Sequence, residues 1–301
     1  MLYDIIIIGA GPAGLTAALY GRRAGHSVLV LEGGVPGGQA VTTPHVENWP
    51  GTKIISGSDF AMSLYEQATG LGAELQFAAA EGLRDQGETK VVTAGGQAFE
   101  GRTVILAAGV RRRKLEVPGE DAFAGHGVSY CATCDGGFFK GKDVAVVGGG
   151  NTALEDAVYL SALCPTVWLI HRRDQYRGEK HLVEAVAARS NIKPLMETKV
   201  LTIEGQSQVT GVRISGPEGG RVLPVAGVFA AVGLIPDNAA FAPPLELDEY
   251  GYVKAGEDCA TGIPGVFAAG DCRSKELRQL VTAAADGAMA ASRAGQYLGR
   301  M

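Results

Sequence analysis

One local pattern occurs twice in the sequence, and it narrows the folds open to the chain. A short apolar run, a turn of the form G-x-G-x-x-[GA], a helix-like segment and a second apolar run follow one another over residues 3–32 and again over residues 143–171. In such β-α-β units the glycines let the backbone approach a pyrophosphate, and the helix N-terminus offers free N–H groups. The repeat therefore predicts an α/β fold with two Rossmann-like dinucleotide-binding domains. The residues expected at the two pyrophosphates are Gly9, Gly11, Pro12, Ala13 and Gly14 in the first copy and Gly148 and Gly150 in the second.

The two copies differ at the residue that meets the ribose. This position, at the end of the second apolar run, is Glu32 in the first copy and His171 in the second. Glu32 can accept hydrogen bonds from a free 2′-hydroxyl but would repel a 2′-phosphate, so the first site should take FAD or NAD. The second copy continues with Arg172, Arg173 and Arg177, and such cations bond a 2′-phosphate, which favours NADPH over NADH. A solvated basic turn is the alternative interpretation.

A second flavin signal lies near the end of the chain. Residues 261–271 read as a turn, a buried strand and the terminal pair Gly270-Asp271, and flavoproteins use such an aspartate on the ribityl chain. This position implies that the FAD domain is discontinuous and that the NADPH domain, which carries a CxxC pair, is inserted into it. The expected boundaries are 1–112 and 240–301 for the FAD domain and 115–235 for the NADPH domain.

Cys131 and Cys134 form the CxxC pair, which indicates disulfide chemistry inside a two-nucleotide frame. A CxxC can also be half of a zinc site, but zinc needs four ligands. The remaining cysteines are isolated in the sequence: Cys164, Cys259 and Cys272. We therefore expect a redox pair and no metal. Asp135 follows directly and is assigned as the acid that protonates a departing thiolate, with a helix cap or turn former as its alternative role.

Composition excludes several other classes of protein. The chain has 301 residues, of which 46% are hydrophobic and 20% charged, as in a globular protein of two domains. The net charge of -5 gives no excess of positive charge of the kind that nucleic-acid-binding proteins carry. The N-terminus has no basic region and its apolar run stops at Gly9, so we expect neither a signal peptide nor a membrane span. A cytoplasmic location follows, where a reducing compartment suits a CxxC that cycles.

With these motifs the chain resembles the low-molecular-weight, bacterial-type NADPH-dependent thioredoxin reductases nearly end to end. The resemblance implies a homodimer with FAD, NADPH and one redox disulfide per subunit, and thioredoxin or a thioredoxin-like protein as partner. It also implies that Cys134 lies nearer the flavin and that Cys131 is the outward nucleophile. The segments that carry it are 9–14, 37–39, 46–51, 107–109, 131–136, 148–155, 171–177, 265–271 and 277–279.

The resemblance extends the two nucleotide sites. At FAD it adds Gly38, Gln39, Asn48, Arg278 and Gln279, and at NADPH it adds Asn151, Thr152 and Glu155. One departure is conservative, because Asp156 stands where a second glutamate is frequent.

The position of the CxxC pair in the inserted domain also bears on mechanism. The nicotinamide and the disulfide must both approach the flavin, and the dithiol must then reach a partner, so we expect the NADPH domain to rotate between two states. A dithiol oxidase and a ferredoxin-linked thioredoxin reductase remain as alternatives, although neither needs the arginine cluster. A flavin-dependent reductase of a non-disulfide acceptor would need no CxxC, and a redox sensor would not turn over.

Overall fold

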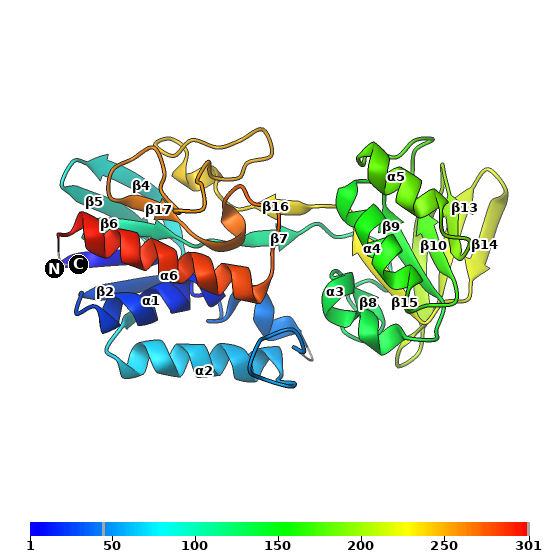
Figure 1. The fold of residues 1–301 in the computed structure, drawn as a ribbon, viewed down its shortest axis with the longest axis horizontal. Coiled ribbons are helices and arrows are strands. Elements are labelled where there is room, and N and C mark those ends of the chain that lie inside the picture. The colour runs from blue at the N-terminus through cyan, green and yellow to red at the C-terminus, as the bar shows by residue number, and fades with distance from the viewer. Residues whose placement is uncertain (44–45, 300–301) are drawn as a thin grey trace. The chain divides into compact units, whose positions relative to one another are not determined.

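The computed structural model describes residues 1–43 and 46–299, and its backbone divides into two compact units. Unit 1 comprises Met1–Arg111 and Ile235–Met301, and unit 2 comprises Arg112–Leu234. The chain crosses between them twice, along β7 (Val110–Arg112) and β16 (Leu234–Pro236), and these two strands pair with each other (Figure 1). The predicted α/β fold, with one Rossmann-like unit inserted into the other along the sequence, is confirmed.

A seven-stranded sheet forms the centre of unit 1. In spatial order its strands are β3 (Glu74–Phe77), β2 (Val28–Glu32), β1 (Leu2–Ile8), β6 (Gln97–Leu106), β5 (Thr89–Ala94) and β4 (Ala80–Gln86), with β17 (Val266–Ala268) also paired to β6. β1 runs parallel to both β2 and β6. Both faces of β1 are covered: Ile5 and Ile7 belong to one hydrophobic core, Ile6 and Ile8 to another. A buried parallel strand of this kind reads as a continuous apolar run.

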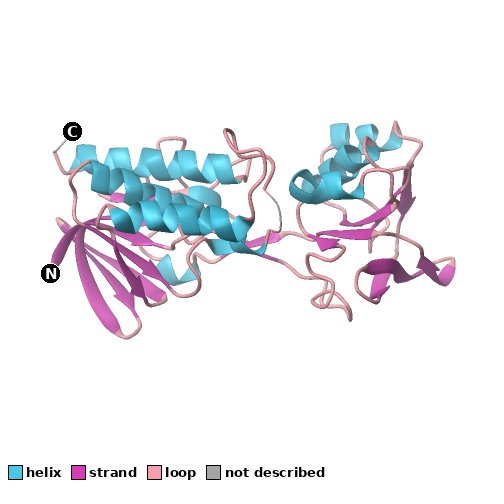
Figure 2. Ribbon diagram, turned by 90° about the horizontal axis from the view of Figure 1, so that it is seen from below, coloured by secondary structure: helices cyan, strands magenta, loops and turns pink. Residues whose placement is uncertain are grey.

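The described part of unit 1 has three long helices: α1 (Pro12–Arg23), α2 (Gly57–Gly70) and α6 (Leu280–Tyr297). Figure 2 shows the helices of this unit together over one face of the sheet. α1 and α6 approach closely because both present small residues, and a Cβ on Gly287 would stand 2.2 Å from the carbonyl oxygen of Ala13. The 3₁₀ turns among the described residues of this unit are η1 (Gly38–Thr42), η3 (Ala239–Phe241) and η4 (Gly270–Cys272).

Unit 2 has a parallel sheet of its own. Its strands, in spatial order, are β11 (Ile192–Leu195), β10 (Val167–Ile170), β9 (Val144–Gly148), β15 (Gly227–Ala231) and β8 (Val128–Ser129). A separate antiparallel sheet contains β12 (Lys199–Gly205), β13 (Val209–Gly216) and β14 (Gly219–Leu223). The helical segments are α3 (Ala132–Asp135), η2 (Gly136–Phe139), α4 (Asn151–Ser161) and α5 (Lys180–Ala187). α4 packs on one face of β9 through Leu154 and Leu160, while β13 residues such as Val212 cover the other face.

Across residues 1–43 and 46–299, no helix combines the length and the apolar character that crossing a membrane requires.

Candidate active site

The first glycine turn joins β1 to α1 and is tight on its inner side. Gly9 has a φ of +100°, and a Cβ there would lie 2.4 Å from the carbonyl oxygen of Ala107. A Cβ on Gly14 would lie 1.8 Å from the carbonyl oxygen of Gly9, so neither position admits a side chain. By contrast, a Cβ on Gly11 would meet nothing within 4 Å. α1 begins at Pro12 without a side-chain cap, so this open turn and the amides of the first helical turn can receive an anion.

Glu32 ends β2 beside this turn. Its carboxylate accepts hydrogen bonds from the backbone N–H groups of Ala10 and Gly34, each at 2.7 Å. These bonds fix the carboxylate against the glycine turn. A carboxylate has about four acceptor positions, so Glu32 retains acceptors for ribose hydroxyls.

The distant C-terminal segment meets the same turn. Gly270 opens η4 with a φ of +78°, and a Cβ on it would stand 2.8 Å from the Cβ of Ala13 in α1. The next residue, Asp271, is half-buried. The structure therefore brings Gly9–Gly14 and Gly270–Asp271 together, as the sequence predicts for a flavin site.

A buried ion cluster supports η4 from α6. Asp286 of α6 is 6% exposed, and its Oδ2 accepts from the backbone N–H of Gly270 at 2.9 Å, from Arg273 Nε at 2.8 Å and from Lys275 Nζ at 2.9 Å. Burial acts to raise the pKa of Asp286, but the hydrogen bonds and charges of Arg273 and Lys275 outweigh it and hold that pKa below its usual range. Asp286 is therefore an anion that positions the turn before Asp271.

The other residues expected at the flavin are brought together in part. Asn48 Nδ2 donates to Gln279 Oε1 at 2.9 Å although the two residues lie far apart in the sequence. The side-chain amide of Gln39 donates to the carbonyl of Val110. Gly38 lies against the first glycine turn, and the Arg278 guanidinium stands 4.3 Å from the ring centre of Tyr252. That these residues contact a flavin stays a prediction.

The second glycine turn joins β9 to α4 and has the same design. A Cβ on Gly148 would lie 2.3 Å from the carbonyl oxygen of Ala231, whereas one on Gly150 would meet nothing within 4 Å. α4 begins at Asn151 without a side-chain cap at the preceding residue. Asn151 is tied to α5, because its Nδ2 donates to Glu179 Oε1 at 2.8 Å and its Oδ1 accepts from the Glu179 N–H at 2.9 Å. Two further predicted residues, Thr152 and Glu155, are exposed on the same helix.

His171 and the arginines that follow it occupy different places. His171 is 7% exposed, and a Cβ on Gly149 would stand only 2.2 Å from its Nδ1, so the imidazole supports the glycine turn from beneath. Arg172, Arg173 and Arg177 are exposed, and the Arg177 N–H donates to the carbonyl of Gly149 at 2.7 Å. The arginines thus remain available to a phosphate, whereas the structure gives His171 a supporting position.

Cys131 and Cys134 are joined in a disulfide with their Cα atoms 5.3 Å apart, as predicted. Both cysteines and Asp135 are half-buried, and the Asp135 N–H donates to the Cys131 carbonyl at 3.1 Å. Asp135 Oδ2 accepts from the hydroxyl of Ser129 at 2.6 Å. Sequence reasoning missed Ser129, because it reads only as the end of a short strand before the cysteines.

Asp156 is a second residue that the sequence does not mark as functional. It is 8% exposed in α4, beneath the CxxC helix. Burial, with the nearby charge of Glu155 adding to it, raises the pKa of Asp156 to about 7, and a hydrogen bond from the backbone of Ala132 opposes the rise. A carboxyl that changes charge near neutral pH therefore contacts the first residue of the CxxC helix.

The three remaining cysteines are buried and are not paired with one another. Burial raises the pKa of Cys164 to about 11, of Cys259 to about 12 and of Cys272 to about 11. Their thiolates are strongly disfavoured at neutral pH, so these thiols behave as small apolar side chains. Within residues 1–43 and 46–299, no group of three or more His, Cys, Asp or Glu side chains could hold a metal ion.

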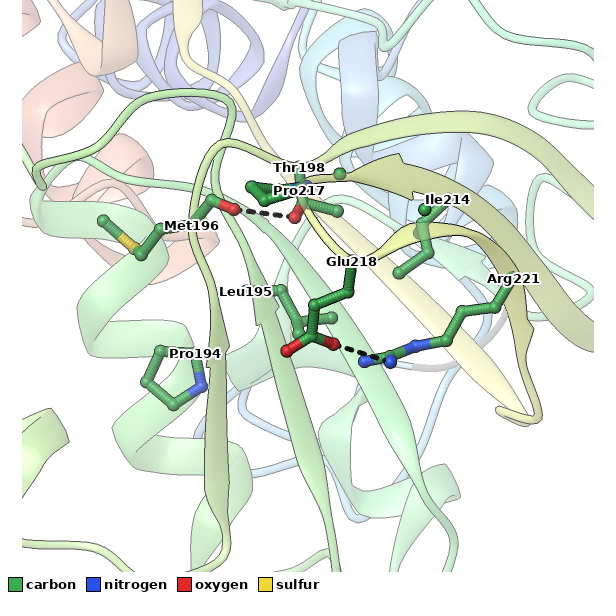
Figure 3. Close-up of a pocket in the computed structure, with 10 residues that line it drawn as sticks. Pro194, Leu195, Met196, Thr198, Ile214, Pro217, Glu218 and Arg221 are labelled. Carbon is green, nitrogen blue, oxygen red and sulfur yellow. Dashed lines mark hydrogen bonds and ion pairs between the residues drawn. The ribbon is translucent and has the colours of Figure 1, made fainter.

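A small pocket is lined by residues other than the predicted site residues, although the N–H of its Thr198 donates to the carbonyl of His171 at 2.9 Å. Its volume is about 140 Å³, and it is lined from β11 to the β13–β14 hairpin by Leu195, Met196, Thr198, Glu218 and Arg221 among others. Figure 3 shows the Glu218–Arg221 ion pair, at 2.8 Å, and the Thr198 hydroxyl donating to the Met196 carbonyl. Since pockets for small molecules usually measure about 300–1,000 Å³, this pocket is too small for a dinucleotide.

Comparison with known proteins matches this arrangement. The family model of the pyridine nucleotide-disulphide oxidoreductases matches residues 3–287. The thioredoxin reductase of Listeria innocua is 43% identical over 300 residues, which cover 99% of this chain and 94% of that protein. The crystal structure of a thioredoxin reductase from Streptococcus pyogenes has a TM-score of 0.94 at 39% identity and covers 100% of this chain and 99% of that one. A ferredoxin-flavin thioredoxin reductase from Clostridium acetobutylicum has a TM-score of 0.54 at 29% identity, with 100% and 99% covered.

Proteins of this family use a flavin and a nicotinamide nucleotide, and the residues present fit both groups. Two open glycine turns lead into helices without side-chain caps, one beside Glu32 and Gly270, the other beside the exposed arginines. The chain therefore belongs to the pyridine nucleotide-disulphide oxidoreductase family, as one of its bacterial-type thioredoxin reductases, and is a flavoprotein disulfide reductase.

Proposed function

We propose that this chain is an NADPH-dependent thioredoxin-disulfide reductase. It takes electrons from NADPH through FAD and the Cys131–Cys134 disulfide to oxidised thioredoxin or a thioredoxin-like protein. The observation that carries the proposal is the formed Cys131–Cys134 disulfide in a chain that also has two open glycine turns. We further propose that the protein is a homodimer, as its resemblance to the thioredoxin reductases implies. We also propose that it acts in the cytoplasm, because a dithiol that cycles needs a reducing compartment.

The choice of cofactors follows from the side chains beside the two turns. When bound, the flavin carries electron pairs from the nicotinamide to the disulfide. Glu32 would receive the ribose of FAD, and Arg172, Arg173 and Arg177 would hold the 2′-phosphate of NADPH. The residues proposed for FAD are Gly9, Gly11, Pro12, Ala13, Gly14, Glu32, Gly38, Gln39, Asn48, Gly270, Asp271, Arg278 and Gln279. Those proposed for NADPH are Gly148, Gly150, Asn151, Thr152, Glu155, Arg172, Arg173 and Arg177, with His171 supporting the turn.

The chain's own residues carry out the reaction with the partner. In the reduced protein the Cys131 thiolate attacks the partner's disulfide, which forms one S–S bond and releases the other partner sulfur as a thiolate. Asp135 supplies the proton to that sulfur. Cys134 then attacks Cys131 Sγ, which breaks the mixed disulfide and restores the intramolecular one; the proton that Cys134 loses passes through solvent to the second partner sulfur, which leaves as a thiol. The dithiol thus gives up two electrons, and Asp135 regains a proton from solvent.

We propose that unit 2 rotates relative to unit 1 between the two half-reactions. The proposal is supported by the connectivity, because only β7 and β16 join the units covalently. A hinge at a few residues of these strands would suffice, and neither unit would have to unfold.

A ferredoxin-linked thioredoxin reductase is the second candidate, since one such protein is among the structural neighbours. That function would give the three exposed arginines no ligand. Reduction of the flavin by NADPH therefore distinguishes the two candidate functions.

An anaerobic titration tests the proposal. The purified flavoprotein is mixed with NADPH, and separately with NADH, while the flavin absorbance is followed; oxidised thioredoxin is then added. We expect NADPH to bleach the flavin and thioredoxin to restore it. Cys134→Ser should abolish the restoration and leave the bleaching intact. A flavin that stays oxidised with NADPH would refute the proposal and favour the ferredoxin-linked or oxidase function.

A further inference from the structure

Ser129 is a buried hydroxyl that the mechanism above does not use. It is the last residue of β8, is 4% exposed and pairs in register with Phe229 of β15, so the parallel sheet fixes its backbone. The next residue is anchored too, because the Tyr130 hydroxyl donates to Glu120 Oε1 at 2.9 Å and Glu120 is 2% exposed. The chain is therefore held firmly on both sides of Ser129 before it reaches the first cysteine.

The hydroxyl of Ser129 meets three polar atoms of the redox loop. Asp135 Oδ2 lies at 2.6 Å, the Cys131 backbone nitrogen at 3.1 Å and the Cys131 carbonyl oxygen at 3.3 Å. One hydroxyl has one hydrogen to donate, and the carboxylate is the nearest acceptor, at a distance typical of a charge-assisted O–H···O⁻ bond. The Oγ lone pair then accepts the N–H of Cys131. A continuous path of hydrogen bonds runs from this amide through Ser129 to Asp135.

We propose that Ser129 is a positioning residue of the redox centre, whose hydroxyl holds the Asp135 carboxylate and the Cys131 backbone in one arrangement while protons move to and from the thiols. The inference rests on the proposed function, which gives Asp135 its role as acid. Asp135 becomes a carboxylate when it protonates the departing partner sulfur, and the Ser129 hydrogen bond stabilises that product. No bond to Ser129 forms or breaks, and the electrons pass as described above.

The pH dependence of the thiol reactions tests this role. The first readout is the single-turnover reduction of thioredoxin by the reduced protein, followed against pH. The second is the rate at which iodoacetamide alkylates Cys131 in a Cys134→Ser background, which needs neither partner nor turnover. Both are measured for wild type, Ser129→Ala, Ser129→Thr and Asp135→Asn. Ser161→Ala is the matched control, because its half-buried hydroxyl donates to the Val158 carbonyl, at 2.7 Å, elsewhere in the same unit.

Each profile should contain an inflection that Asp135→Asn removes. We expect Ser129→Ala to move this inflection upward by roughly one pH unit: two or three hydrogen-bond donors together lower a carboxyl pKa by about two, and Ser129→Ala removes one donor from Asp135. Ser129→Thr keeps a hydroxyl and should follow wild type, as should Ser161→Ala. In an Asp135→Asn background Ser129→Ala should produce no further shift.

Two results would overturn the inference. One is a Ser129→Ala profile that overlays wild type; the other is an equal shift in the Asp135→Asn background, which would show that Ser129 acts without Asp135. Thermal unfolding checks that each variant folds. Should Ser129→Ala not fold, Ser129→Thr decides, because a Thr variant that loses the wild-type inflection contradicts the role of the hydroxyl. If wild type itself does not reduce thioredoxin, the proposed function fails, while the alkylation profiles still decide the role of Ser129.

Discussion

Replacing the buried carboxyl of α4 by its neutral isostere, Asp156→Asn, should make the stability of unit 2 less dependent on pH. Burial, supported by the charge of Glu155, raises the pKa of Asp156 from its ordinary value of 3.8 to about 7. Between these pH values the folded chain binds a proton at Asp156 that the unfolded chain does not. Wild type therefore has its full stability below about pH 4 and loses part of it as the pH rises through about 7.

The size of the effect follows from the same two values. At about 1.36 kcal/mol per pH unit, the ionised carboxyl costs up to about 4 kcal/mol of unfolding free energy above pH 7. Local relaxation and water entry reduce such penalties, so we expect Asp156→Asn to exceed wild type by about 1–4 kcal/mol at pH 8. The advantage should vanish toward pH 4. The asparagine carbonyl can still accept the Ala132 N–H, so that hydrogen bond need not be lost.

Thermal unfolding of the oxidised, cofactor-free protein at a series of pH values provides the assay. For a unit of this size, about 1 kcal/mol shifts the melting temperature by roughly 4 °C, so the difference at pH 8 should be about 4–15 °C. Asp174→Asn, an exposed aspartate in the same unit, is the control and should change little at any pH. A difference between Asp156→Asn and wild type that is the same at pH 5 and pH 8 would refute the reasoning, because it would show that Asp156 does not change charge in this range.

Three further predictions concern other parts of the molecule. Arg172→Ala combined with Arg173→Ala should raise KM for NADPH roughly 10- to 100-fold, because two charge-assisted contacts to a 2′-phosphate are lost, while KM for NADH changes less than about 2-fold in the same steady-state assay. Asp286→Asn should lower the unfolding free energy of unit 1 by about 3–5 kcal/mol, since it removes the buried carboxylate shared by Arg273 and Lys275 and leaves Arg273 paired with the exposed Glu257. Glu218→Gln at an exposed pair should cost less than about 1 kcal/mol, and urea unfolding compares the two variants. Gly14→Ala should abolish flavin retention in gel filtration, and retention of flavin by this variant would contradict the geometry of the turn. Gly11→Ala, where a Cβ meets nothing within 4 Å, should leave the fold intact by circular dichroism.

The fold could be predicted because its signals are local. An apolar strand, a glycine turn and a helix are adjacent in the sequence, so the two β-α-β units and the return of residues 266–271 to the first of them could be read directly. The CxxC pair is equally local. Ser129 and Asp156 could not be found in this way, because their roles come from burial and from contacts with Asp135 and Ala132 that only the folded chain creates.

His171 shows a second limit of sequence reasoning. It stands in a run of cations, and the run predicts that its members meet a phosphate together. The structure separates them, because a ring that fills the space beneath Gly149 is not at the surface with Arg172 and Arg173. A sequence pattern shows which residues are near a site, but it does not show which of them are buried; that His171 and the arginines meet a nucleotide stays a prediction.

The insertion of one unit into the other also bears on how the chain is made. Unit 2 is one continuous stretch, Arg112–Leu234, and can fold as soon as it has left the ribosome. Unit 1 lacks β17 and α6 until the residues after unit 2 that form them are synthesised, which takes several seconds at about 5–20 residues per second. Until then the small-residue face of α1 has no α6 to cover it, and Gly270 and Asp271 are absent from the first glycine turn. Flavin capture should therefore be a late step that follows the synthesis of α6, and a shortage of flavin would leave unit 1 as the vulnerable part of a nascent chain whose redox unit is already folded.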